Sequence, residues 1–166
     1  MGLKEDFSLD NVALSEHYLK LQRRFHPDRF VDGSAQEQRL AVQMASVVNQ
    51  ACDTLRSPLL RAAYLLKLQG IDSSGENTTM SDVTFLMSQM QLREQLAAIT
   101  SAEDPFVALE LVAVEVASQL ADLEALFAEQ YAEKAFTAGS DTLVKMQFYN
   151  KLQLEVNALE DSLEDV

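Results

Sequence analysis

The sequence predicts an all-α protein, and three observations support that prediction. The 166 residues are 48% hydrophobic, so the chain can bury a core. Only 5 glycines and 3 prolines occur, which leaves few helix breakers. Apolar residues recur at helical spacing in the long segments, and no run alternates between apolar and polar residues as a half-buried strand would.

The first predicted helix ends near Phe25 and is amphipathic. Its apolar stripe recurs at i, i+4, i+7 and i+11 and consists of Leu14, Tyr18, Leu21 and Phe25. Three basic side chains fall away from that stripe, towards solvent: Lys20, Arg23 and Arg24. We interpret this basic face as a docking patch for an acidic protein surface. The alternative is an ordinary solvated helix face.

The tripeptide His26-Pro27-Asp28 follows this helix directly. Proline has a fixed φ and no amide hydrogen, so the helix must end before it. The result is an imidazole and a carboxylate on a rigid corner beside a patch of positive charge. Such a tripeptide also arises by chance as a helix-ending turn, so its surroundings decide how it is interpreted.

Two further helices are predicted before a polar segment. Ser34 with Glu37 forms a capping box that starts the second helix. The predicted apolar face of that helix consists of Leu40, Met44, Val47, Val48, Ala51 and Leu55. Ser57-Pro58 starts a third helix, which runs to about Leu68 and is ended by Gly70. We expect a first domain over residues 1–70, a linker over residues 71–78 and a second domain over residues 79–166.

The second domain is predicted to be an antiparallel bundle of three helices. The first runs from about Met80 to Ile99, with Thr79 and Asp82 as cap candidates. The second starts at Asp104-Pro105, and its apolar residues are Leu109, Val112, Val116, Leu120, Leu123 and Phe127. The third starts either near Glu133, running through Gly139, or at Ser140, and its apolar face carries Leu152, Val156, Leu159 and Leu163.

The helix over residues 80–99 has two apolar faces. One suits the bundle core and consists of Phe85, Leu92, Leu96 and Ile99. The other points roughly 150° away, shares its direction with Glu94, and consists of Leu86, Met87 and Met90. These residues either fill a wide core or form an exposed patch for a partner, where methionine is useful because it is flexible and polarizable.

Charge and cysteine content exclude several classes of function. Residues 81–166 hold 4 Lys+Arg and 16 Asp+Glu, so this half would repel a phosphate backbone and we expect no nucleic-acid partner. Cys52 is the only cysteine, which suits a reducing compartment. We interpret it as a small buried side chain rather than a ligand, and we expect neither a metal nor a cofactor. No apolar stretch approaches the roughly 20 residues needed to span a bilayer, and the first residues lack a secretory pattern. We therefore expect a bacterial-type cytoplasmic protein.

Three blocks of the sequence resemble a J-domain, the module that stimulates ATP hydrolysis by DnaK-type chaperones. They are residues 20–30 (KLQRRFHPDRF), residues 48–51 (VNQA) and residues 55–64 (LRSPLLRAAY). The last two blocks narrow the resemblance to the HscB family of iron–sulfur co-chaperones, and it covers nearly the whole chain. The fold implied is an N-terminal J-domain helical hairpin plus a C-terminal antiparallel three-helix bundle. The function implied is that of a non-enzymatic co-chaperone in iron–sulfur cluster protein maturation.

The resemblance also implies site residues. An HscA/DnaK-type ATPase chaperone would be engaged by His26, Pro27 and Asp28, with Lys20, Arg23 and Arg24 as electrostatic support. The IscU-type scaffold, on which clusters are assembled, would be bound by Leu86, Met87, Met90, Gln91, Glu94 and Phe148. Gln91 and Ala98 stand where the family commonly has acidic residues, which predicts a less charged scaffold surface. The family's short aromatic-rich opening helix is missing ahead of Gly2-Leu3, so the first helix is expected to be truncated and residues 1–70 less stable.

Three alternatives remain open at this point. The first is a J-domain protein that serves another client. The second is an acidic helical adaptor whose His-Pro-Asp is accidental. The third is an enzyme that uses His26 as a general base, which needs a pocket and a partner group; the other histidine, His17, lies over two helical turns away.

Overall fold

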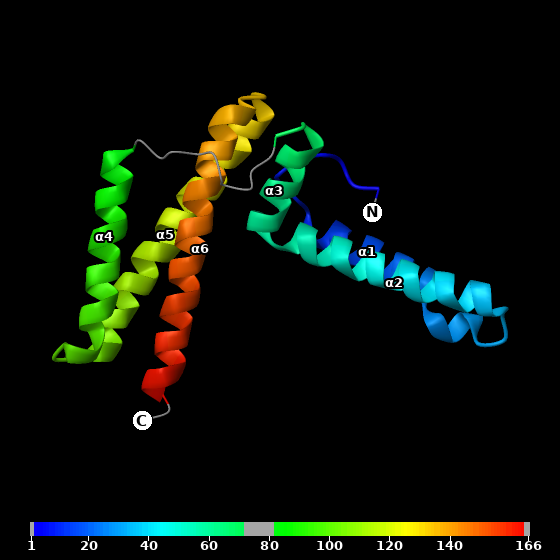
Figure 1. Ribbon diagram of the computed structural model, residues 1–166, viewed down its shortest axis with the longest axis horizontal. Coiled ribbons are helices and arrows are strands. Elements are labelled where there is room, and N and C mark those ends of the chain that lie inside the picture. The colour runs from blue at the N-terminus through cyan, green and yellow to red at the C-terminus, as the bar shows by residue number, and fades with distance from the viewer. Residues whose placement is uncertain (1, 72–81, 165–166) are drawn as a thin grey trace. The chain divides into compact units, whose positions relative to one another are not determined.

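The computed structural model describes residues 2–71 and 82–164, and every element within them is helical. The chain forms two compact units, residues 1–70 and 71–166 (Figure 1). The predicted all-α fold class is confirmed. Most of the predicted linker, residues 72–78, lies outside the described residues, as does the cap candidate Thr79. Within the described ranges, no helix combines the length and the apolar character that crossing a membrane requires.

The first unit is a helical hairpin with a third helix at its end. Helix α1 spans Asn11–Phe25, the 3₁₀ turn η1 spans Pro27–Phe30, α2 spans Ala35–Arg56 and α3 spans Pro58–Leu68. Asp10 caps α1 by accepting hydrogen bonds from the amides of Val12 (2.8 Å) and Ala13 (3.2 Å). Figure 1 shows α1 and α2 lying side by side and joined at the η1 corner.

The capping box predicted for the second helix is present. The Glu37 amide donates to Ser34 Oγ (3.3 Å), and the Ser34 amide donates to Glu37 Oε2 (2.8 Å). The hydrogen bond from the Ser34 hydroxyl holds the pKa of the Glu37 carboxyl below its usual range. Ser57 caps α3 in the same way, accepting from the Leu60 amide (3.3 Å), with Pro58 at the first helical position.

The apolar face predicted for α2 is partly wrong. Leu40 and Val47 are exposed, whereas the α2 residues that are buried are Ala41, Val48 and Cys52. The reason is geometric: at about 100° per residue the three buried residues share one side of α2, and Leu40 and Val47 point roughly 100° away from it. Cys52 is confirmed as a buried thiol. The hairpin is also joined by polar contacts, since the Tyr18 hydroxyl lies 3.1 Å from Asn49 Oδ1.

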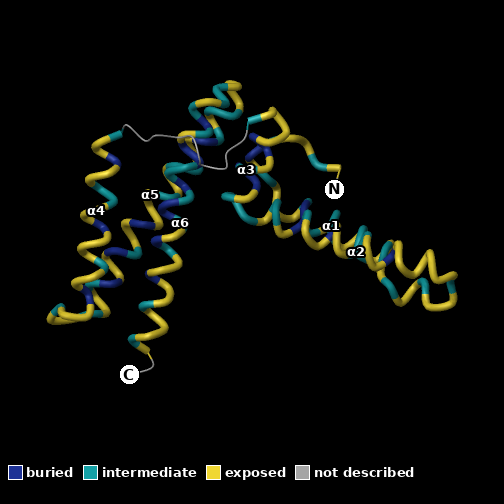
Figure 2. The backbone as a smooth tube through the Cα atoms, viewed as in Figure 1, coloured by how far each residue is buried: buried dark blue, intermediate teal, exposed yellow. Residues whose placement is uncertain are grey.

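The second unit is the predicted three-helix bundle. Helix α4 spans Val83–Ala98 and ends in the 3₁₀ turn η2 at Ile99–Ser101, α5 spans Pro105–Ala132, and α6 spans Phe136–Glu164. The predicted core residues of the three helices are confirmed: all are buried or packed against the buried cluster. Figure 2 shows these buried positions in dark blue along the helices.

Of the two starts predicted for the last helix, the structure has the earlier one. Helix α6 begins at Phe136 and continues through the buried Gly139. The turn before it contains Lys134 with a φ of 60°, and the Ala135 amide donates to the Gln130 carbonyl (2.8 Å). Thr142 and Gln130 then hydrogen-bond across the two helices (2.7 Å), which fixes their register just after the turn.

Candidate functional site

The His26-Pro27-Asp28 corner forms a tight, internally bonded turn. His26 caps η1, because its Nδ1 atom accepts a hydrogen bond from the Asp28 amide (3.3 Å). The Arg29 amide donates to the His26 carbonyl (3.0 Å). Asp28 Oδ2 also lies 3.5 Å from Nδ1, but a nitrogen that accepts the amide hydrogen bond cannot at the same time donate to this carboxylate. These bonds within the turn fix the relative positions of His26, Asp28 and Arg29.

The corner is open to solvent. The His26 side chain is 50% exposed and the Asp28 side chain 85% exposed, while Pro27 is half-buried. An accessible imidazole and carboxylate on a fixed turn can form hydrogen bonds and ion pairs with a docking surface. In the part of the chain that the structure describes, neither side chain forms an ion-pair contact with a third residue, and both lie at the surface rather than in a pocket.

The basic residues of α1 lie on the approach to this corner. Lys20, Arg23 and Arg24 are all exposed, and the last two occupy the final turn of α1, where a positive charge is stabilised by the helix dipole. Among the described residues, Lys20 forms one long ion pair, with Glu16 (4.0 Å), and the Arg24 guanidinium lies 5.3 Å from the centre of the Phe25 ring. The structure thus brings the six residues predicted for chaperone binding to one end of the hairpin.

Arg29 is a part of the corner that the sequence reasoning did not assign. Its Nη1 atom donates a hydrogen bond to the Arg23 carbonyl (3.1 Å), an acceptor left open at the end of α1. On the other side of the turn, Gln38 Nε2 donates to the carbonyls of Val31 (2.8 Å) and Gly33 (3.1 Å). These long side chains fasten the turn to both helices. The only sequence signal was the place of Arg29 next to the tripeptide.

A second exposed surface lies on α4. Leu86, Met87 and Met90 are 42%, 67% and 65% exposed, which rules out the interpretation that they fill a wide core. Gln91 and Glu94 are also exposed, so five of the six residues predicted for scaffold binding share the outer side of one helix. We call these five residues the α4 face. Val83, which the sequence reasoning did not assign, is exposed one turn before Met87 and extends the apolar surface.

Phe148, the sixth residue predicted for scaffold binding, is placed differently. It is only 9% exposed and belongs to the buried cluster of the bundle. Its ring makes edge contacts with the rings of Phe85 (5.5 Å) and Tyr149 (5.4 Å), and the Arg93 guanidinium lies 5.6 Å from its centre. Phe148 therefore packs against α4 from within the bundle core, and the Arg93 guanidinium lies over its ring.

An ion pair fixes the start of α4. Asp82 caps the helix by accepting from the Phe85 amide (3.0 Å), and its other oxygen lies 2.7 Å from Lys145 Nζ on α6. The hydrogen bond from Lys145 holds the pKa of the Asp82 carboxyl below its usual range, and the Phe85 amide adds to this effect. Lys145 Nζ also lies 5.2 Å from the centre of the Phe85 ring. One lysine thus joins the first turn of α4 to α6 and to the aromatic core.

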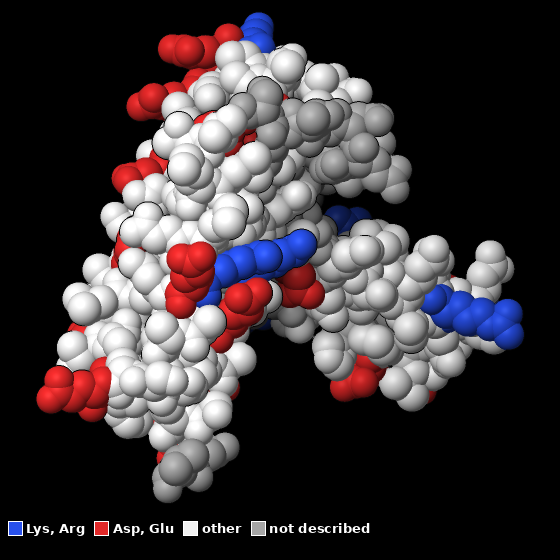
Figure 3. Space-filling model, turned by 60° about the vertical axis from the view of Figure 1, so that its left-hand side comes forward, with Lys and Arg blue, Asp and Glu red and all other residues white. Residues whose placement is uncertain are grey.

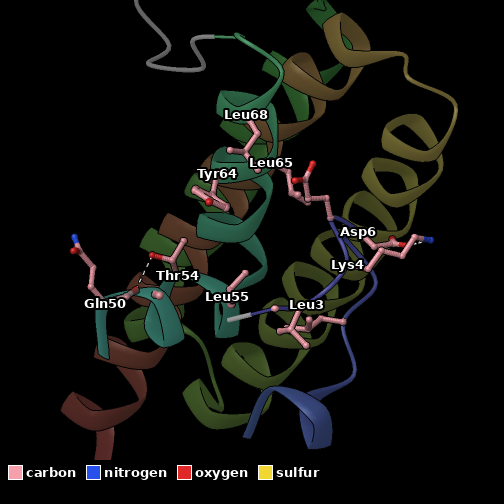
Figure 4. A pocket seen from close by; sticks show the side chains of 13 residues that line it. Leu3, Lys4, Asp6, Gln50, Thr54, Leu55, Tyr64, Leu65 and Leu68 are labelled. Carbon is pink, nitrogen blue, oxygen red and sulfur yellow. Dashed lines mark hydrogen bonds and ion pairs between the residues drawn. The ribbon is translucent and has the colours of Figure 1, made fainter. Parts of the chain in front are cut away.

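A pocket of about 470 Å³ lies within the first unit, away from the corner. Figure 4 shows its walls, which come from the N-terminal segment, the end of α2 and α3. The labelled apolar side chains are Leu3, Leu55, Leu65 and Leu68; among the polar ones, Lys4 pairs with Asp6 (3.3 Å) and Thr54 bonds the Gln50 carbonyl (2.9 Å). None of the residues that line the pocket belongs to the His26-Pro27-Asp28 corner, so the pocket does not enclose His26 as an enzyme's base would require.

Metal-ligating side chains do not gather in the part of the chain that the structure describes. Within residues 2–71 and 82–164, no group of three or more histidine, cysteine, aspartate or glutamate side chains is placed to hold an ion. The His-Pro-Asp corner with its basic approach and the α4 face are exposed surfaces rather than cavities that enclose a substrate.

Comparison with known proteins agrees with these features. The family model described as "HSCB C-terminal oligomerisation domain" matches residues 81–157. The chain is 42% identical over 166 residues to the co-chaperone protein HscB homolog of Aliivibrio salmonicida, which covers 98% of this chain and 95% of that protein.

Solved structures show the same similarity. The chaperone HscB from Vibrio cholerae matches with a TM-score of 0.87 and 40% identity, over 98% of this chain and 95% of that one. Human co-chaperone protein HscB matches with a TM-score of 0.89 and 28% identity, over 96% of this chain and 79% of that one. The similarity thus extends over both units and is not confined to the bundle.

Proposed function

The chain belongs to the HscB family of co-chaperones, and we propose that it acts in iron–sulfur cluster biogenesis by stimulating the ATPase of an HscA/DnaK-type chaperone and delivering an IscU-type scaffold to it. The observation that carries this proposal is the exposed His26-Pro27-Asp28 corner at the end of a basic helix. It is the feature of the first unit whose chemistry is directed at another protein.

The corner would act by contact. Lys20, Arg23 and Arg24 would attract an acidic surface of the chaperone and raise the rate of encounter. His26 and Asp28 would then make the short-range hydrogen bonds and ion pairs that fix the docked orientation. The bonds from Arg29 and Gln38 keep the turn in one conformation, so little ordering entropy would be lost on docking.

The α4 face would carry the scaffold. Its leucine and two methionines offer an adaptable apolar surface, and Glu94 supplies a negative charge at its edge. Gln91 is neutral, so apolar contact would contribute more of the affinity than charge. Because one chain carries both surfaces, a bound scaffold would be held near the chaperone at a high effective concentration.

Steady-state ATP turnover by the chaperone tests this proposal. The chaperone is assayed alone, with this protein, and with this protein plus the scaffold, and we expect turnover to rise at each addition. Asp28→Asn should remove the stimulation while scaffold binding in a calorimetric titration is unchanged. Asp32→Asn is the matched control, because it makes the same change of charge at an exposed position four residues away and should leave the stimulation intact.

The outcomes separate the alternatives. Full stimulation by Asp28→Asn, or no effect of His26→Gln, would favour the acidic adaptor with no chaperone role. Stimulation of the ATPase without binding to the scaffold would identify a J-domain protein for another client. Catalytic activity of the isolated chain would favour the enzyme.

A further inference from the structure

Helix α5 carries an exposed apolar stripe that the bundle does not use. Val107, Leu111 and Val114 follow one another at i, i+4 and i+7 and are 52%, 69% and 64% exposed. The stripe continues through three small exposed residues: Ser118, Ala121 and Ala125. We call these six residues the α5 stripe. Figure 2 marks exposed stretches of α5 in yellow.

The α5 stripe is separate from the bundle core. The core is built on the opposite side of the same helix, where Leu109, Val112 and Val116 are buried. At about 100° per residue, these three point roughly 140–200° away from Val107. The stripe also lies on a different helix from the α4 face, so it is not part of the scaffold surface proposed above.

Acidic residues border the α5 stripe on both sides. Glu110 lies on one side, and Glu115 and Asp122 lie on the other, each within about 80° of its centre line. Helix α5 contains no lysine or arginine in its 28 residues. Among the described residues, no ion pair involves Glu110, Glu115 or Asp122. On the face shown in Figure 3, acidic side chains (red) recur along the left-hand edge.

We propose that the α5 stripe binds a basic amphipathic helix of a partner protein. The three large apolar side chains fit an apolar stripe of the same spacing, and the small residues after them allow two helices to approach closely. The unpaired carboxylates on both sides fit lysine or arginine flanking the partner's stripe. A second copy of this chain fits less well, because its own carboxylates would meet these and each copy carries a net charge of −13.

Titration of the full chain with a designed peptide tests the proposal. The probe is an 18-residue helix with leucine at i, i+4, i+7 and i+11 and lysine on both sides of that stripe; its twin has glutamate in place of every lysine. We expect the lysine peptide to bind with a Kd that rises with salt, and the glutamate twin not to bind. The double variant Leu111→Gln, Val114→Gln should weaken the lysine peptide at least tenfold.

Matched controls distinguish the stripe from general attraction to an acidic protein. Leu154→Gln changes an apolar side chain on α6 that is also exposed, and it should change Kd less than twofold. Glu110→Gln with Asp122→Asn should weaken binding and reduce its salt dependence, whereas Glu155→Gln with Glu160→Gln on α6 should do neither. Circular dichroism and the Tm confirm that each variant remains folded.

Three results would overturn the proposal. The first is that the lysine peptide does not bind at millimolar concentration. The second is that the stripe variants and the α6 controls lose affinity equally. The third is that sedimentation shows a dimer of this chain that Leu111→Gln, Val114→Gln abolishes, which would make a second copy the occupant. None of these readouts uses the ATPase or the scaffold, so the proposed function stands or falls separately.

Discussion

Phe148 and Met90 test which side chains of the bundle stabilise its fold and which would bind the scaffold. Sequence resemblance assigns both to the scaffold surface, but Phe148 is buried beneath Arg93 whereas Met90 is 65% exposed. Alanine at Phe148 removes a ring that contacts Phe85 and Tyr149, so it should cost about 3–5 kcal/mol of unfolding free energy. Alanine at Met90 removes atoms that already contact water and should change stability by less than about 0.5 kcal/mol.

The two substitutions should therefore change different measured quantities, Tm for Phe148→Ala and the Kd for the scaffold for Met90→Ala. In a unit of this size, a loss of about 3 kcal/mol lowers Tm on the order of 15 °C. Met90→Ala should leave Tm nearly unchanged but weaken scaffold binding by about 1–4 kcal/mol, which is roughly fivefold to several hundredfold in Kd. Thermal unfolding followed by circular dichroism gives the first quantity, and calorimetric titration with the scaffold gives the second.

Control variants separate a loss of stability from a loss of scaffold binding. Gln119→Ala, at an exposed position on α5 rather than on the α4 face, should change neither quantity. Phe148→Leu fills most of the cavity and should recover much of the lost Tm. The reasoning is refuted if Phe148→Ala keeps its Tm and loses scaffold binding, or if Met90→Ala lowers Tm as far as Phe148→Ala does.

Three other predictions follow from the same contacts. Asp82→Asn retains a helix cap but loses the charge paired with Lys145. Because folding lowers the pKa of Asp82, the wild type should be more stable than the variant at neutral pH, and this difference should vanish as the pH falls below about 4. Urea unfolding at a series of pH values measures the difference. Arg29→Ala removes the bond to the Arg23 carbonyl and should raise the concentration needed for half-maximal ATPase stimulation about two- to tenfold, with Arg29→Lys intermediate. Neutralising Lys20, Arg23 and Arg24 to glutamine should slow association with the chaperone and flatten its salt dependence in stopped-flow measurements.

Helix-capping residues that lie close together in the sequence made several helix starts predictable. The pairs Ser34–Glu37, Ser57–Pro58 and Asp104–Pro105 each mark a helix start, and each lies where the structure has one. These signals work because capping depends on residues three or four positions apart. The core-facing residues predicted for α5 and α6 were also predictable, because they recur at the spacing of helix turns.

Tertiary contacts account for what the sequence did not predict. The start of α6 has no such cap signal, and it depends on a turn at Lys134 whose positive φ is uncommon for that residue type. Leu40 and Val47 look apolar and periodic, but the hairpin offers α2 no partner on that side. The role of Arg29 depends on a carbonyl six residues away, and the burial of Phe148 depends on the ring of Phe85 on another helix.

The distribution of basic residues links the two units to different partners. Residues 81–166 contain 4 Lys+Arg, and two of them, Arg93 and Lys145, lie over the rings of Phe148 and Phe85 in the core of the bundle. Cations placed on aromatic rings support the packing of α4, and helix α5 itself carries acidic residues and no basic ones. In the first unit, Arg23 and Arg24 instead lie exposed at a helix end. The first unit therefore presents basic residues near its corner and the second presents acidic residues on α5, which suits the binding of two partners that differ in charge.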